Sequence, residues 1–178
     1  MSKKDFDFSI ALLKEFFNKN HVKQILKHVD SCSIKGWEKW LQIEISYFLS
    51  NHKSIAEWNN EEAFDVDNRK DKERSIARVD FVVRKKGTAK NRFMVWELKC
   101  KYKPTTCIRH MVEDMNKVEA TKTKDFMRSY WLIGVHSAIN SNKNIYQLID
   151  SYNSKYTLKQ TQIISEKIRG TNFYFTVF

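Results

Sequence analysis

The sequence predicts an α/β fold built as a mixed central β-sheet flanked by helices. Segments with helical periodicity alternate with short apolar segments typical of strands, in the order helices, two adjacent strands, helix, strand, helix, strand. The chain of 178 residues is 42% hydrophobic and contains only four glycines and one proline, which leaves little material for linkers. We therefore expect a single domain that covers residues 1–178.

Helices are predicted where apolar side chains recur every three or four positions and so share one face. Five segments have this pattern, namely 8–17, 22–29, 34–49, 107–119 and 145–152. The third is the strongest prediction, because Trp37, Leu41 and Phe48 belong to one broad apolar face.

Two adjacent strands are predicted in the middle of the chain. Residues 77–83 and 93–100 are rich in Val, Phe, Met and Trp, and Lys85-Lys86-Gly87 supplies a turn between them. Further strands are expected at 130–135, at 172–178 and at the start of the polar segment 57–74, which then becomes a loop.

The charge balance of the chain indicates which classes of partner it can bind. A formal net charge of +11 favours polyanions, with nucleic acid before anionic membranes. No apolar run approaches the ~20 residues that span a bilayer, so no membrane partner is expected. Three cysteines at no metal-ligand spacing argue against a disulfide framework and predict a cytoplasmic protein. Because the sequence lacks a glycine-rich phosphate loop, no fused ATPase is expected.

The residues best suited to catalysis lie in the two adjacent strands. Asp80 interrupts an apolar strand, where a carboxylate is costly unless it is paired or bound to a metal. In the next strand, alternation places Glu97 and Lys99 on one face. If the strands form a hairpin, Asp80 lies near Glu97, and a divalent cation would offset the repulsion between the carboxylates. This set suits phosphodiester hydrolysis, because Mg²⁺ activates water and an ammonium group stabilises the developing charge.

The spacing of these residues resembles the signature of the PD-(D/E)xK nuclease superfamily: Asp80, sixteen intervening residues, then Glu97-Leu98-Lys99. The resemblance covers residues 36–135, with Val79 in the nominal Pro position. It implies a restriction-endonuclease-like three-layer fold. It also implies that Asp80, Glu97 and the backbone carbonyl of Leu98 bind Mg²⁺, for which Mn²⁺ can substitute, and that Lys99 serves the attacking water.

The resemblance also divides the domain. We expect a catalytic core at 34–135, preceded by an N-terminal helical extension at 1–33 and followed by a C-terminal helix and strand at 136–178.

Members of the superfamily often carry a further acid near the metal, on the helix before the strands. Glu44 is the first choice for this role, because it falls among Trp37, Leu41 and Phe48 on the apolar face and needs a partner there. Glu38 is the second choice, at the edge of that face, and its spacing to Gln42 also resembles a pattern in some relatives. Both alternatives stay open.

Basic residues cluster around the motif. Arg78 is the best single candidate for a phosphate contact, because it shares a strand face with Asp80. Arg74, Lys101 and Lys103 are further candidates for nucleic-acid binding. In the helix that follows, Asp114 and Lys117 resemble an Asp and a Lys that several relatives carry there, but an i,i+3 ion pair explains them equally well. We interpret them as structural or as a minor backbone contact.

The leading hypothesis is therefore Mg²⁺-dependent hydrolysis of DNA, with RNA as the alternative substrate and a homodimer as one arrangement of the chain. Two hypotheses of another class stand beside it: a nucleic-acid-binding module that does not cleave, and a basic interaction protein. The presence of Asp80, Glu97 and Lys99 together favours the enzyme.

Overall fold

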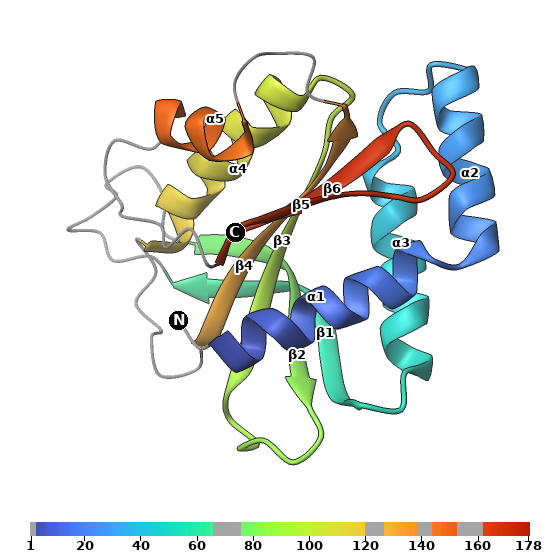
Figure 1. The fold of residues 1–178 in the computed structure, drawn as a ribbon. Helices are drawn as coiled ribbons and strands as arrows, with labels where there is room; N and C mark the ends of the chain where they lie inside the picture. Colours follow the sequence, from blue (N-terminus) through green and yellow to red (C-terminus); the bar gives the residue numbers. More distant parts are fainter. Residues whose placement is uncertain (1–2, 66–75, 120–126, 139–143, 153–161) are drawn as a thin grey trace.

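The chain folds into an α/β structure around one mixed β-sheet, here described by a computed structural model (Figure 1). The structure describes residues 3–65, 76–119, 127–138, 144–152 and 162–178. Six strands form the sheet in the order β1-β2-β3-β4-β6-β5. They are β1 (Ile55–Asp65), β2 (Ile76–Lys85), β3 (Phe93–Cys100), β4 (Met127–Ser137), β5 (Ile164–Lys167) and β6 (Phe173–Val177).

The sheet is mixed because one of its pairings is parallel. Strands β3 and β4 run parallel, with Glu97 opposite Leu132, and α4 connects them. All other neighbouring strands in the described sheet are antiparallel. Parallel neighbours need a long crossover, and the helix supplies it.

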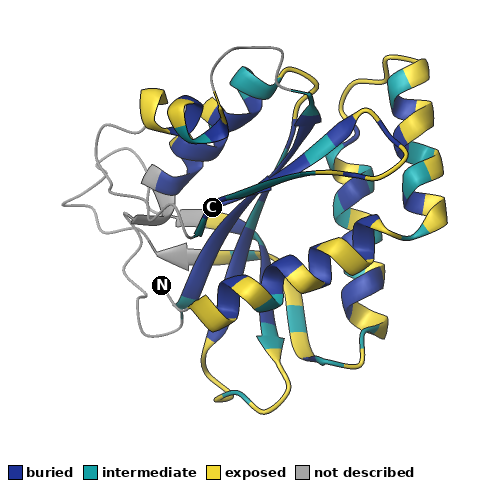
Figure 2. Ribbon diagram, in the orientation of Figure 1, coloured by how far each residue is buried: buried dark blue, intermediate teal, exposed yellow. Residues whose placement is uncertain are grey.

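Helices cover both faces of the sheet (Figure 1). One face carries α1 (Lys3–Phe17), α2 (Asn20–Ser31) and α3 (Glu38–Asn51), and the other carries α4 (Pro104–Glu119) and α5 (Ile145–Tyr152). Figure 2 shows that the helix surfaces facing the sheet are buried, while their outer surfaces are exposed. The prediction of a mixed sheet flanked by helices is confirmed.

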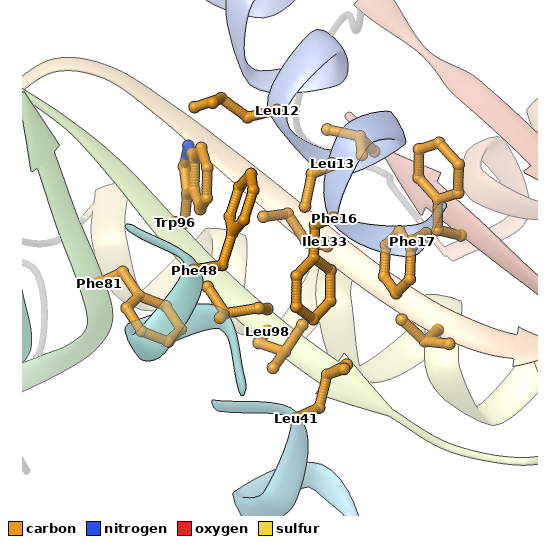
Figure 3. Packing of buried hydrophobic residues seen from close by; sticks show 14 of the residues in the cluster. Leu12, Leu13, Phe16, Phe17, Leu41, Phe48, Phe81, Trp96, Leu98 and Ile133 are labelled. Atoms are coloured by element: carbon orange, nitrogen blue, oxygen red, sulfur yellow. The ribbon is translucent and has the colours of Figure 1, made fainter. Parts of the chain in front are cut away.

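The larger core lies between the sheet and the first three helices. Figure 3 shows Phe16 of α1, Leu41 of α3 and Leu98 of β3 packed together there. Trp96 lies in the same core and donates its indole N–H to Ser9 Oγ at 3.2 Å. The predicted N-terminal extension is thus packed on the sheet, and α1 supplies part of the main core.

On the opposite face, α4 packs closely on β4 at Gly134. A Cβ at this position would clash with Met111 Sδ and would lie 3.0 Å from Cys107 Sγ, and both of those side chains are fully buried. We expect Gly134→Ala to lower the free energy of unfolding by about 1–2 kcal/mol, because α4 must shift to admit the methyl group. Urea denaturation would measure this. Gly170→Ala, where nothing lies within 4 Å but φ is +81°, is a control for backbone strain alone.

The elements agree with the sequence predictions except near their ends and near the C-terminus. The strand at 93–100 and the helix at 145–152 have the predicted bounds. The third helix begins at Glu38, four residues later than predicted, because Gly36 adopts a φ of +72°. Strand β5 was not predicted, since it has only four residues and most of them are polar. The predicted loop at 66–74 lies outside the described residues.

None of the helices described by the structure is long and apolar enough to cross a membrane.

Candidate active site

The candidate site forms where β2 and β3 diverge. The antiparallel ladder between them ends at the pair Phe81–Trp96, whereas β2 continues back to Ile76 in its pairing with β1. Beyond this point, main-chain N–H groups that would have joined the ladder need other acceptors, because a buried unpaired N–H is costly.

Carboxylates accept these main-chain hydrogen bonds. The N–H of Leu98 donates to Asp80 Oδ2 at 2.7 Å, and the N–H of Asp80 donates to Glu97 Oε2 at 3.3 Å. Further along β3, the N–H of Cys100 donates to Glu38 Oε2 at 2.7 Å. The expected approach of Asp80 and Glu97 is therefore present, and the end of the ladder holds them side by side.

Helix α3 contributes two side chains to this cluster. Glu38, its first residue, reaches the main chain of β3, and Gln42, one turn later, donates its amide N–H to Asp80 Oδ1 at 2.8 Å. Both oxygens of Asp80 are thus engaged, one by β3 and one by α3.

The preference for Glu44 over Glu38 is corrected by this geometry. Glu44 accepts a hydrogen bond from the indole N–H of Trp40 at 3.3 Å and lies 3.2 Å from His21 Nε2, so its partners belong to α3 itself and to α2, and not to the strands of the site. Glu44 lies six positions after Glu38, which turns their side chains about 120° apart around the helix. Glu44 lies at an edge of the apolar face of α3, whereas Glu38 points in nearly the same direction as Gln42.

Lys99 lies beside the two acids on the face covered by α4. Its Nζ is 2.8 Å from Asp114 Oδ2 and 3.9 Å from Glu97 Oε1. Asp114 is buried, with 2% of its surface exposed. Asp114 is therefore a buried partner of Lys99, which its i,i+3 spacing to Lys117 did not predict.

The site carries more negative than positive charge. Burial, followed by repulsion from Asp80 and Asp114, raises the pKa of Glu97 to about 8. Burial also raises the pKa of Asp80 to about 6, against a lowering contribution from the Leu98 N–H. For Lys99, burial alone would lower the pKa, but Asp114 and the nearby glutamates outweigh it and hold the pKa above its usual value. Lys99 is therefore a fixed cation at neutral pH.

A divalent cation fits the donor chemistry of this site. Among the described residues no group of three or more His, Cys, Asp or Glu side chains is arranged to hold a metal. Mg²⁺, however, usually takes one or two carboxylates and completes its shell with water and phosphate oxygens. Asp80 and Glu97 provide two such carboxylates, whose raised pKa values reflect burial and unneutralised repulsion. The Leu98 carbonyl points to the same side as its N–H, because both groups of a strand residue face one neighbour.

The basic residues around the site are partly described. Arg78, Lys101 and Lys103 are exposed, with Arg78 on β2 and the two lysines directly after β3. Arg74 lies outside the described residues. The exposed cations are thus available to an anionic partner near the carboxylates.

Comparison with known proteins found no match to this chain among protein-family models, curated proteins or solved structures. The chemistry of the site is therefore the basis for a functional proposal.

Sequence reasoning named Asp114 but did not place it in the site. Asp114 could have been found, because it falls between Met111 and Met115 on the apolar stripe of α4, where an acid needs a partner.

Proposed function

We propose that this protein is a Mg²⁺-dependent nuclease that hydrolyses phosphodiester bonds of DNA, with a restriction-endonuclease-like core. The observation that carries the proposal is the convergence of Asp80, Glu97 and Lys99 at the point where β2 and β3 diverge. The resemblance of these residues to the PD-(D/E)xK signature and the net charge of +11 support the same function.

Each of these residues has a role that its surroundings support. Asp80 and Glu97 would hold the cation, with Gln42 and the Leu98 N–H orienting Asp80. A bound Mg²⁺ would polarise the phosphate and lower the pKa of a bound water. Lys99 is held as a cation by Asp114, so it would stabilise negative charge on the phosphate or orient the water, and not act as a base.

The surface around the site suits a phosphate backbone. Arg78, Lys101 and Lys103 are exposed near the ends of β2 and β3, so they could pair with phosphates on either side of the bond that is cut. Such contacts weaken steeply as salt rises, which gives binding a simple signature.

A module that binds nucleic acid without cleaving it is the second candidate. One observation favours it: both oxygens of Asp80 already accept hydrogen bonds, and the described residues contain no group of three metal-binding side chains. In that case the carboxylates would only replace the missing ladder between β2 and β3.

Cleavage of supercoiled plasmid and single-stranded DNA, in Mg²⁺ or in EDTA, tests the proposal. We expect the wild-type protein to cut in Mg²⁺ only, and Glu97→Ala and Lys99→Ala to lose about 100-fold or more of the rate, because each removes charge that acts on the reacting phosphate. Glu44→Ala is the matched control, since it removes an acid of the neighbouring helix that lies away from the site. It should cut at the wild-type rate.

The controls separate the two candidates. If the wild-type protein binds these DNAs with a steep salt dependence but cuts neither them nor RNA, the binding module is the better function. If Glu44→Ala loses as much activity as Glu97→Ala, the assignment of the site is wrong.

A further inference from the structure

Tyr102 is an exposed aromatic residue that lies directly after β3, between two lysines. All three residues of the segment Lys101-Tyr102-Lys103 are exposed, and 55% of the tyrosine surface is accessible to solvent. Tyr102 follows Lys99 by three positions, so the two Cα atoms lie at most about 11 Å apart. The ring is therefore within reach of the nucleotides next to the bond that the site would cut.

The main chain of this segment is fixed to the end of β4. The N–H of Lys101 donates to the Val135 carbonyl at 3.1 Å, and the Tyr102 carbonyl accepts the N–H of Ser137 at 2.9 Å. These hydrogen bonds extend the pairing of β3 with β4 beyond Cys100, its last paired residue.

The side chain of Tyr102 is held by its hydroxyl group and by one ring contact. The hydroxyl donates to Asp30 Oδ1 at 2.9 Å, and the other oxygen of Asp30 accepts the side-chain N–H of Asn172, where the turn between β5 and β6 reaches α2 (Figure 1). The ring of Phe173 lies edge to face with the tyrosine ring, with the centroids 5.9 Å apart. Such a contact covers at most one face of the tyrosine ring, and the exposure of the residue leaves the other face open. Tyr102 is thus a fixed, flat surface that loses little conformational freedom when a flat ligand stacks on it.

Phe173 also links Tyr102 to the helix that carries Glu38. The ring centroid of Phe173 lies 5.3 Å from that of Trp37, which directly precedes Glu38 at the start of α3. Glu38 accepts the N–H of Cys100, two positions before Tyr102. Tyr102 therefore lies at the end of β3 that the acids of the site occupy.

The combination of an open tyrosine face and flanking lysines suits one class of ligand. Aromatic side chains stack on bases of any sequence, while lysines bind the phosphates between them. Inside a duplex a base presents only its edges in the grooves, because its faces are covered by the neighbouring base pairs. Stacking on Tyr102 thus needs an unpaired base, or one that is flipped out of the duplex at a cost of a few kcal/mol.

We propose that Tyr102 stacks on an unpaired base next to the bond that is cut, so that DNA with unpaired bases is the substrate class of this site. This inference rests on the proposed function for the identity of the ligand, whereas the stacking itself can be measured without cleavage. Tyr102 determines specificity and takes no part in breaking the bond.

Binding in EDTA to three labelled DNAs tests the stacking: a single strand, its duplex, and a strand with the same backbone but no bases. A length of about 12 nucleotides lies within the range of known single-strand sites. We expect the wild-type protein to bind the single strand about tenfold more tightly than the abasic strand, as for one stacked base. Tyr102→Ala should abolish most of this difference and should bind the duplex and the abasic strand like the wild-type protein, because Lys101 and Lys103 still contact the phosphates. Fluorescence anisotropy would measure the four affinities that decide this.

Two further variants separate stacking from a loss of structure. Tyr102→Phe retains the ring and loses only the hydrogen bond to Asp30, so it should keep most of the preference for the strand with bases. Tyr47→Ala removes a tyrosine that is 68% exposed and is turned about 180° from Glu38 around α3, so it should bind all three DNAs like the wild-type protein. The inference is overturned if Tyr102→Phe loses as much affinity as Tyr102→Ala, if the wild-type protein binds both single strands equally, or if it binds no DNA.

A cleavage assay in Mg²⁺ separates this inference from the proposed function. Tyr102→Ala should cut single-stranded DNA with a KM raised about tenfold and an unchanged kcat, because the stacked base is not the reacting group. If the protein binds the single strand through Tyr102 but cuts no nucleic acid, the proposed function fails and the stacking stands. If the wild-type protein cuts DNA and Tyr102→Ala binds and cuts single strands equally well, the function stands and the inference is overturned.

Discussion

Replacing Asp114 with alanine is expected to lower the free energy of unfolding by about 3 kcal/mol. Asp114 is buried, and its carboxylate lies 2.8 Å from Lys99 Nζ. Removing one partner of a buried pair leaves the other charge partly buried without compensation, which costs about 3–5 kcal/mol when burial is complete. The Lys99 side chain retains 19% exposure, so the lower end of this range applies. Urea denaturation at pH 7 would measure the loss.

The same pair can be tested by replacing both partners. In the double variant Lys99→Met with Asp114→Leu no charge of the pair is left behind, so it should be more stable than Asp114→Ala alone. Arg109 and Glu113, an exposed i,i+4 pair on the same helix, provide a control: Glu113→Ala should change stability by less than about 0.5 kcal/mol. Equal losses of stability in Asp114→Ala and Glu113→Ala would show that the buried pair is no more sensitive to the loss of one partner than the exposed pair.

Loss of the Asp114 charge should also affect the proposed reaction. Without the Asp114 carboxylate, Glu97 is still within ion-pair range of Lys99, because its Oε1 lies 3.9 Å from Lys99 Nζ. We expect Lys99 to move toward Glu97 and to neutralise a carboxylate that the cation requires. Asp114→Asn, which preserves size, should therefore cut DNA at least about tenfold more slowly than the wild-type protein.

The centre of the sheet could be predicted from the sequence because the residues that determine it lie close together in the chain. Strand β3 has continuous apolar character and ends in Glu97 and Lys99, and its bounds are those expected. Asp80 could be placed near Glu97 because a short turn joins their strands, and the ladder between β2 and β3 confirms the pairing. Antiparallel strands that are joined by a short turn pair with each other, so the position of one strand indicates that of its neighbour.

The helix acid could not be predicted with equal success, because it depends on how α3 is rotated against the sheet. The apolar face of α3 is broad, so periodicity alone allowed either Glu38 or Glu44 to face the strands. What decides between them is the Cys100 N–H, which needs an acceptor only because β2 diverges from β3. Such a divergence has no local signature in the sequence.

The contribution of α4 was missed for a related reason. Asp114 is far from the motif in the chain and reaches Lys99 only through the packing of α4 on the sheet. Its role follows from tertiary contacts. Charge and burial patterns can flag Asp114 in an apolar stripe, but they cannot name Lys99 as its partner.

In the absence of divalent cations, the protein is expected to lose about 2 kcal/mol of stability between pH 6.5 and pH 8. Burial and repulsion raise the pKa of Asp80 to about 6 and that of Glu97 to about 8. In the unfolded chain both groups titrate near pH 4. Between these values the folded state binds more protons than the unfolded state, so stability falls as pH rises through the folded pKa of the pair. The expected loss of stability corresponds to one extra proton bound by the folded state over about 1.5 pH units.

The pH range avoids the other buried titratable groups. Burial raises the pKa of the Cys100 and Cys107 thiols, so they lower stability only as pH rises toward and above the unfolded thiol value near 8.5. Burial lowers the pKa of His136, so this residue adds stability as pH rises toward the unfolded histidine value near 6.5 and adds no further slope above it. Guanidinium denaturation in EDTA at several pH values would measure the slope. Glu97→Gln should flatten it and should be more stable than the wild-type protein at pH 9, whereas Glu44→Gln should retain it.

The effect of Mg²⁺ on this pH dependence of stability tests whether Asp80 and Glu97 bind the cation. A cation that binds the ionised pair stabilises the folded state by mass action, so millimolar Mg²⁺ should recover stability at pH 8–9 and have little effect at pH 5, where the pair is protonated. Glu97→Gln should respond to Mg²⁺ weakly at every pH. A wild-type protein with the slope in EDTA but without a response to Mg²⁺ or Mn²⁺ would contradict the metal site, because the repulsion between Asp80 and Glu97 would then have no cation to relieve it.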